Sequence, residues 1–227
     1  MQVRKKFFIR SVFAAATILA SSYMVRAHPH VFVDGGFDFV ISESQQLTAI
    51  RVTWRYDTFE TLYMLSEMNV SLAPNSDFSV ADREIVEATL GSFPPDFDGS
   101  VHITLVGDRI ALQDPRNLTA RMVGDRLEIT FLRDLEIPVG LREQKFNIGF
   151  YERTYFFAFS LTDVPDFGRA ADRCSYEKTP FDTSKRTDKV LLELAKLGRE
   201  ETPEDSNIGA TLADRMVVSC SRDRRSF

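Results

Sequence analysis

Two of the three histidines of the chain lie two residues apart, at His28 and His30, with Pro29 between them. If the chain is cut after Ala27, His28 carries a free amine beside its own imidazole, and these two nitrogens can close a six-membered chelate on one metal ion. The imidazole of His30 adds a third nitrogen within reach. Amine and imidazole donors suit nickel, cobalt, zinc and copper. The pattern therefore predicts a divalent transition-metal site whose affinity falls as the pH drops below neutrality.

Asp34 and His102 are the two candidate co-ligands. On a regular strand Asp34 points the same way as His30 but lies roughly 13 Å along it. It can share an ion with His30 only if the chain curls near Gly35 or another strand supplies the bridge. His102 lies on the polar face of a predicted strand and could approach the N-terminus across a sheet. The alternatives are that His28-Pro29-His30 only begins a strand and that His102 is a surface residue.

Motifs typical of enzymes are missing from the sequence. It contains no Gly-x-Ser-x-Gly and no glycine-rich strand-to-helix turn, the marks of a serine nucleophile and a phosphate cradle. Asp57, Glu60 and Glu152 are carboxylates at predicted strand or helix ends, where a cap, a solvated charge and a turn residue are the plainer interpretations. We expect the protein not to be an enzyme. A copper oxidase using His28 and His102 is the enzymatic alternative.

The first 27 residues have the character of an export signal. Basic residues precede an apolar run over 11–20, small and apolar residues lead to Ala27, and there is no twin arginine before the run. This order predicts a Sec-type signal peptide, a periplasmic location and no stable membrane insertion after cleavage; an uncleaved anchor is the alternative. Removal of the five basic residues of the leader takes the formal net charge from −5 to −10. So acidic a chain is a poor ligand for nucleic acids.

Cys174 and Cys220 are the only cysteines of the chain. In an exported protein the default expectation for two cysteines is one disulfide. Closing a loop of that length stabilises a fold by about 4 kcal/mol in the chain-entropy model. A two-cysteine metal or redox site is the alternative, which the wide spacing and the lack of a nearby histidine disfavour.

The elements that must position these residues are mostly strands. Apolar and polar residues alternate over 48–56, and residues 30–41 predict a hairpin partner with a bend at Gly35-Gly36. Glycine-aspartate turns separate further alternating runs. These runs cover 101–105, 110–112, 122–123 and 127–131, and two more runs, 146–150 and 155–161, are joined through Glu152-Arg153. The middle of the chain is therefore predicted to be antiparallel sheet.

Short helices complete the prediction. Asp57 and Ser79 are expected N-caps, and Phe59, Leu62, Tyr63 and Leu65 form an apolar stripe on the first helix. A third helix is expected over 187–197, whereas 166–183 is expected to be irregular. The fold class is therefore α+β, with an antiparallel β-rich, sandwich-like core and a C-terminal helical appendage. We expect a single domain over 28–227, made of the core (28–165) and a disulfide-tied appendage (166–227), after the signal peptide (1–27).

Four segments together resemble a bacterial exported family of unknown function, DUF1007. They are His28-Pro-His-Val-Phe-Val-Asp34, Trp54-Arg-Tyr-Asp57, Tyr151-Glu-Arg-Thr-Tyr-Phe-Phe-Ala-Phe159 and the stretch 202–220. Members are often labelled the periplasmic component of an uncharacterised ABC-type transport system, and their genes often neighbour nickel and cobalt permeases. The resemblance thus implies an inner-membrane metal permease or ABC-type transporter as partner. A metal-independent interaction module for such a transporter is the alternative.

The chain departs from the family pattern at two places. Where it has Tyr151-Glu152-Arg153-Thr154-Tyr155, the family commonly has Tyr-Asp-Pro-Thr-Tyr, and an acidic residue is common where this chain has Ala158. A metal site that used those acidic positions would be altered here. The matching histidines therefore carry over better than the carboxylates.

Overall fold

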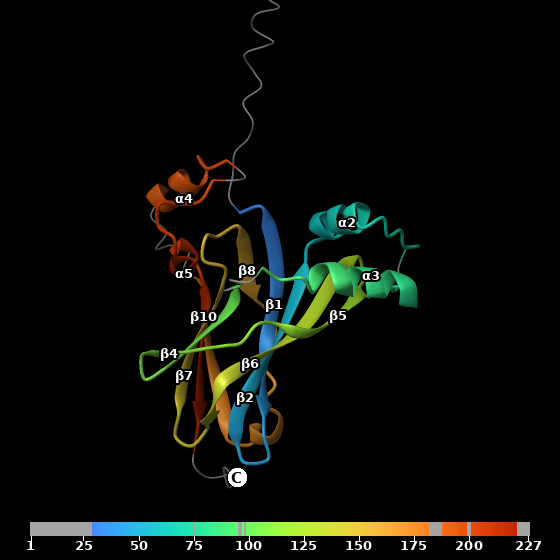
Figure 1. Cartoon of the computed structure of the whole chain (residues 1–227). Helices are drawn as coiled ribbons and strands as arrows, with labels where there is room; N and C mark the ends of the chain where they lie inside the picture. Colours follow the sequence, from blue (N-terminus) through green and yellow to red (C-terminus); the bar gives the residue numbers. More distant parts are fainter. Residues whose placement is uncertain are drawn as a thin grey trace, which may run out of the picture.

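Two five-stranded sheets packed face to face form the body of the protein (Figure 1). The computed structural model describes residues 29–74, 76–94, 97, 99–181, 188–198 and 201–221. Helices lie at the edges and at one end of the sandwich, and none in this part of the chain is long and apolar enough to cross a membrane. The predicted β-rich α+β fold is confirmed.

The first sheet holds the N-terminal hairpin, with strand order β5-β6-β2-β1-β8. Its hairpins β1–β2 and β5–β6 are antiparallel, as predicted, but β8 pairs with β1 in parallel. The chain therefore crosses from one sheet to the other between β7 and β8. The strands are β1 (Val31–Ile41), β2 (Gln46–Tyr56), β5 (Arg116–Val123), β6 (Arg126–Gly140) and β8 (Phe157–Leu161).

The second sheet has the order β4-β3-β7-β10-β9, and all four of its neighbouring strand pairs are antiparallel. The C-terminal segment contributes two of its strands, so it is more than an appendage, and 166–183 is not irregular throughout. It contains a short 3-10 helix, η1 (Gly168–Ala170), and a strand. The strands are β3 (Ser100–Leu105), β4 (Asp108–Ile110), β7 (Lys145–Tyr151), β9 (Cys174–Thr179) and β10 (Asp214–Cys220).

The glycine pair in β1 does not form the predicted bend. β1 pairs with β2 without interruption from Val33 to Val40, and the register shifts only between Val40 and Ile41. A Cβ on Gly35 would lie 2.0 Å from the carbonyl oxygen of Thr53. Glycine is needed here because the neighbouring backbone comes close, not because the strand turns.

Both predicted helix caps are confirmed. Asp57 accepts a hydrogen bond from the Glu60 amide at the start of α2 (Thr58–Glu67), and Ser79 accepts one from the Asp82 amide at the start of α3 (Val80–Leu90). Such caps satisfy amides that lack a partner in the first turn of a helix. Two further helices, α4 (Asp188–Leu194) and α5 (Ile208–Thr211), belong to the C-terminal segment.

The predicted disulfide is confirmed. Cys174 and Cys220 are bonded and face each other on the neighbouring strands β9 and β10. Since β10 also pairs with β7, the bond ties the edge strand β9 to the centre of the second sheet. Disulfides of this kind are typical of proteins that fold in an oxidising compartment.

The core fills the space between the two sheets and is rich in aromatic side chains. Trp54 of β2 packs against Phe131 and Phe159, with ring centroids 5.3 and 5.1 Å away. Removing such surfaces from water stabilises a fold by about 25 cal/mol per Å². Among the described residues, the largest fully buried side chains of this core are Phe131, Phe146, Phe150, Leu47, Ile50, Ile103, Leu127, Ile129, Leu141, Ile148 and Leu161.

Asp77 ties the start of α3 to the edge strand β5. Its carboxylate accepts hydrogen bonds from the amides of Met122 and Phe78, which, with Arg83, hold the pKa of Asp77 below its ordinary value. A carboxylate whose pKa is lowered by folding stabilises the fold at pH values above its unfolded-state pKa. This stabilisation is lost as the pH falls through the folded-state pKa.

Asp77→Asn should therefore destabilise the protein at neutral pH and matter less in acid. Because the side chain of Asp77 is 48% exposed, we expect a loss of less than about 1 kcal/mol at about pH 7. Urea unfolding of both proteins at about pH 7 and about pH 3 measures this difference, which should shrink below the unfolded-state pKa of about 3.9. An equal difference at both pH values would contradict the assignment.

Candidate metal centre

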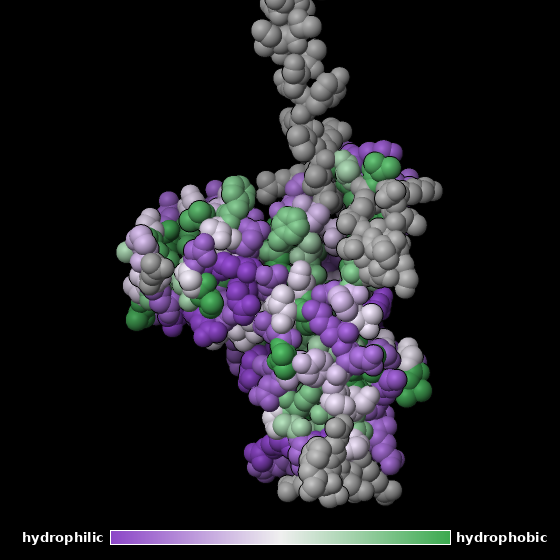
Figure 2. All heavy atoms as spheres, turned by 180° about the vertical axis from the view of Figure 1, so that it is seen from behind, coloured by the Kyte–Doolittle hydropathy of each residue, from purple (hydrophilic) through white to green (hydrophobic). Residues whose placement is uncertain are grey.

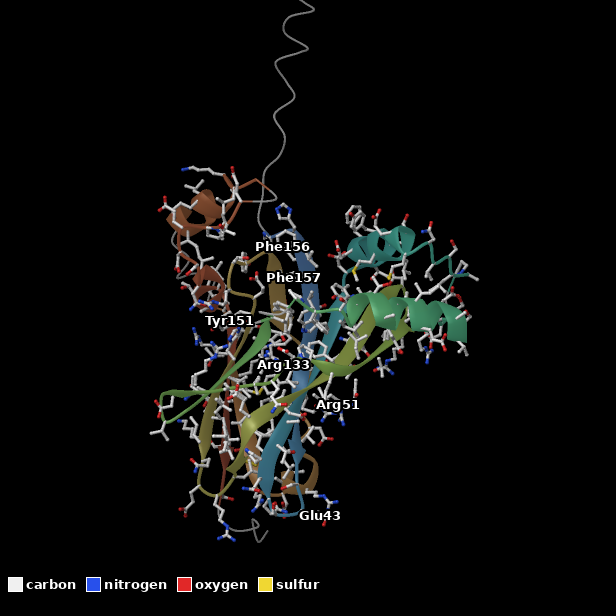
Figure 3. The ribbon with its side chains drawn as sticks, in the orientation of Figure 1. Glu43, Arg51, Arg133, Tyr151, Phe156 and Phe157 are labelled. Atoms are coloured by element: carbon white, nitrogen blue, oxygen red, sulfur yellow. A yellow bond between two sulfur atoms is a disulfide. The ribbon has the colours of Figure 1, made fainter. Side chains whose placement is uncertain are left out.

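The candidate site lies at the end of the sandwich where β1 begins and where β7 passes into β8. We call this end of the sandwich the N-terminal end; it carries His30 and the loop 152–156, and His102 lies at the far end of that loop. His28, which is also a predicted ligand, lies outside the described residues. Figure 3 shows Phe156 at this end beside the start of β1, and Tyr151 farther down on the β7 side.

His30 is held in place by Phe156, the last residue of the loop before β8. Its amide donates to the Phe156 carbonyl at 3.0 Å, and the next amide, of Val31, reaches the same oxygen at 3.3 Å. The half-buried imidazole of His30 lies against the Phe156 ring, with centroids 5.2 Å apart. The chain thus enters the sheet at a fixed point, which is two residues after His28.

The loop 152–156 is organised by the carboxylate of Glu152. This carboxylate accepts hydrogen bonds from the amides of Thr154 (2.8 Å) and Phe156 (2.9 Å) and from the Thr154 hydroxyl. Tyr155 completes the turn in the left-handed region, with φ of 62°. A carboxylate with this many donors shapes the loop, so Glu152 is the predicted turn residue.

Helix α5 packs against the backbone of the loop 152–156 through Gly209. The Gly209 amide donates to the Arg153 carbonyl at 2.9 Å, and a Cβ on Gly209 would lie 1.8 Å from the Glu152 carbonyl oxygen. Only glycine allows two backbones to come so close. Tyr155 packs against a small apolar cluster built on Leu194, Ile208 and Leu212. The C-terminal helices therefore position the loop that holds His30.

His102 lies at the other end of the same loop. Its ring stacks on Tyr151, with centroids 3.9 Å apart and planes at 15°, and its Nε2 lies 3.1 Å from the Tyr151 carbonyl oxygen. The strand partner of His102 is Gly149, where a Cβ would come within 2.7 Å of the Tyr151 ring. Gly149 therefore leaves the space in which the two rings stack.

Asp34 is not brought to His30. β1 continues straight past it, and the Asp34 carboxylate is paired with Arg126 at 2.8 Å. The same guanidinium donates to the Tyr56 and Arg55 carbonyls, which fixes it between the strands. Asp34 therefore serves as the partner of a half-buried arginine on the outer side of the first sheet.

The described residues contain no group of three or more His, Cys, Asp or Glu side chains that could hold a metal ion. Of the four predicted ligands, His30 and His102 lie at opposite ends of one loop and Asp34 lies apart from both. What this arrangement offers chemically is one imidazole at a fixed position on the chain, to which the amine and imidazole of His28 would add nitrogen donors.

Comparison with known proteins places the chain in a family. It belongs to the family described as "Protein of unknown function (DUF1007)", whose model matches residues 13–220. An uncharacterised protein of Haemophilus influenzae is 21% identical over 202 residues, which cover 88% of this chain and 94% of that protein. The acetylcholine-binding protein of Bulinus truncatus covers 92% of this chain and 96% of its own at 11% identity, but its TM-score of 0.34 is too low to carry an argument.

The supporting residues Gly149, Gly209 and Phe156 were not predicted from the sequence. The sequence held a signal for one part of the loop. Glu152 precedes Thr154 by two residues, which is the spacing at which a turn carboxylate accepts a hydrogen bond from a backbone amide. No local pattern marks Gly209, because the backbone it approaches lies over 50 residues earlier in the chain.

Proposed function

We propose that this protein is a periplasmic accessory protein of a transport system. It binds a divalent transition metal ion through His28 and His30 and delivers the ion to an inner-membrane permease or ABC-type transporter. The observation that carries the proposal is the anchoring of His30: its amide is bonded to Phe156 and its ring rests on the Phe156 ring. Donors that begin next to a fixed imidazole lose less conformational freedom when an ion binds.

The chemistry of the donors selects the metal. The nearby carboxylates are engaged, Glu152 in the loop and Asp34 with Arg126, so the ligands are nitrogens. Calcium and magnesium prefer oxygen donors, whereas imidazole and amine groups suit nickel, cobalt, zinc and copper. We therefore propose nickel, cobalt or zinc as the ion, with copper as a further candidate.

Two features support the proposed location. The disulfide Cys174–Cys220 suits an oxidising compartment. The basic and apolar pattern of residues 1–27 is that of a cleaved Sec-type leader. Cleavage after Ala27 also creates the amine that the metal site needs, so export and metal binding are linked in this proposal.

Substitution of His30 tests the proposal, with a substitution of His102 as its control. His30→Ala in the mature chain should weaken nickel binding by at least about tenfold, because it removes one of three proposed nitrogen donors. His102→Gln is the matched control and should leave the affinity within about twofold, since His102 is bonded to Tyr151 at the other end of the loop. Calorimetric titration measures both. Equal affinity of wild type and His30→Ala would overturn the proposed site.

A further inference from the structure

Helix α2 buries Thr61 and Leu65 against the sandwich and leaves three large apolar side chains facing solvent. Thr61 is fully buried, and its hydroxyl accepts a hydrogen bond from the Leu127 amide at 2.9 Å. By contrast Phe59, Leu62 and Tyr63 are 80%, 63% and 44% exposed. Residues three and four apart share one face of a helix, so these side chains form a single apolar stripe, which we call the α2 stripe.

The part of the chain that carries the α2 stripe is strongly acidic. Residues 57–91 contain seven acidic residues and one basic residue, Arg83. The guanidinium of Arg83 is paired with Asp77 at 2.8 Å, so it does little to offset the remaining acids. Glu60 and Glu67 lie on α2 itself. The stretch that carries the apolar stripe therefore has a formal net charge of −6.

The two helices stand beside the sandwich at its N-terminal end and form a lobe of their own. Figure 1 shows α2 and α3 to one side of the first sheet, and Figure 2 shows apolar side chains among hydrophilic ones on this lobe from behind. The cap of α2 touches the start of the sandwich, because the Asp57 amide donates to the Phe32 carbonyl at 3.2 Å. Phe32 is itself 55% exposed.

We propose that the α2 stripe docks a protein segment that carries apolar side chains flanked by lysine or arginine. Exposed apolar side chains gathered on one helix face mark interaction surfaces, and burying them stabilises a complex by about 25 cal/mol per Å². The negative charge of this stretch determines the kind of partner. It would repel an anionic lipid surface or the same face of a second copy, and it would attract a segment whose apolar residues are flanked by lysine or arginine. This inference does not depend on metal binding.

A synthetic peptide tests the proposal. The probe is a fluorescent amphipathic helix of leucine and lysine, about 18 residues or five turns long, with a leucine–glutamate peptide as its counterpart. The whole mature protein should bind the lysine peptide, with an affinity that falls as salt is added, and should not bind the glutamate peptide. Fluorescence anisotropy measures both. Failure to bind the lysine peptide, or equal binding of both peptides, overturns the proposal.

Variants locate the binding on the α2 stripe. The double variant Phe59→Ser, Leu62→Ser should weaken binding by at least about tenfold, and Glu60→Gln with Glu67→Gln should weaken it less and flatten the salt dependence. Ile137→Ser is the matched control, because Ile137 is 76% exposed on β6 and should not contribute. An equal loss in the control, or none in the Phe59 and Leu62 variant, overturns the assignment.

Two further outcomes would give the stripe a different occupant. If the wild type binds vesicles of anionic phospholipid and the Phe59 and Leu62 variant does not, the surface is a lipid contact. If sedimentation shows a dimer of the wild type that the same variant abolishes, a second copy occupies the stripe. Either result would overturn the proposal of a basic protein segment.

Discussion

Replacing Cys174 and Cys220 with serine should lower the free energy of unfolding by about 2 to 4 kcal/mol. The bond closes a loop with a sequence separation of 46 residues, and losing it returns that loop to full freedom in the unfolded chain. Small domains have only about 5 to 15 kcal/mol in total, so this would be a large fraction of the stability. Guanidinium unfolding of the double variant and the wild type measures the difference.

Reduction of the wild type serves as the control for this experiment. Dithiothreitol should lower the stability of the wild type to that of the double variant and should leave the double variant unchanged. If the variant unfolds at the same guanidinium concentration as the oxidised wild type, the bond does not stabilise the second sheet, and its position between β9 and β10 would need another explanation.

Gly209→Val should destabilise the protein by about 2 to 4 kcal/mol, because a side chain there cannot coexist with the loop 152–156. Its Cβ would stand 1.8 Å from the Glu152 carbonyl oxygen, and moving α5 away would break the bond from the Gly209 amide to Arg153. Thermal unfolding measures the loss of stability. Hydrogen exchange should also become faster at the His30 amide, since Phe156, its acceptor, belongs to the same loop.

Gly140→Ala is the matched control for this substitution. Nothing lies within 4 Å of the place where its Cβ would be, so its stability should change by less than about 0.5 kcal/mol. If Gly209→Val proved as stable as Gly140→Ala, α5 would not support the loop. Unchanged exchange at His30 in a destabilised Gly209 variant would instead mean that the loop holds its shape without α5.

Features with local signals were predictable from the sequence. The caps at Asp57 and Ser79 depend on a side chain and an amide three residues apart, and the β1–β2 hairpin follows from two alternating runs joined by a short polar turn. Predicting the disulfide needed only the number of cysteines and the predicted export signal. In each case the interacting groups are close in sequence or few in number.

Long-range relations were not predictable. β7 and β8 are consecutive, yet they lie in different sheets, because β8 pairs in parallel with β1 over 120 residues earlier. The stripe of Phe59, Leu62 and Tyr63 has the spacing of a core-facing stripe, but α2 packs on the sheet through Thr61 and Leu65 instead. Spacing identifies the face of a helix and does not say whether a sheet or a partner covers it.

The candidate site was predictable only in part. The residue types and spacing of His28-Pro29-His30 are enough to suggest nitrogen ligands, but the role of Asp34 depends on Arg126, 92 residues away in sequence. Similarly, the support of His30 comes from Phe156 and, through the loop, from Gly209. A single sequence without its fold gives no means of pairing such distant residues.

The measurement that tests the central claim most directly is calorimetric titration of the mature chain that begins at His28 with a free amine. Nickel, cobalt, zinc and copper would each be titrated at about pH 7.5 and at about pH 5.5, on either side of the reference pKa of histidine of about 6.5, and again with a methionine placed before His28. We predict one ion per chain, weaker binding at the lower pH and at least about tenfold weaker binding with the added methionine. Failure to bind any of the four ions, or equal affinity with the amine blocked, would contradict a metal centre built on His28 and His30.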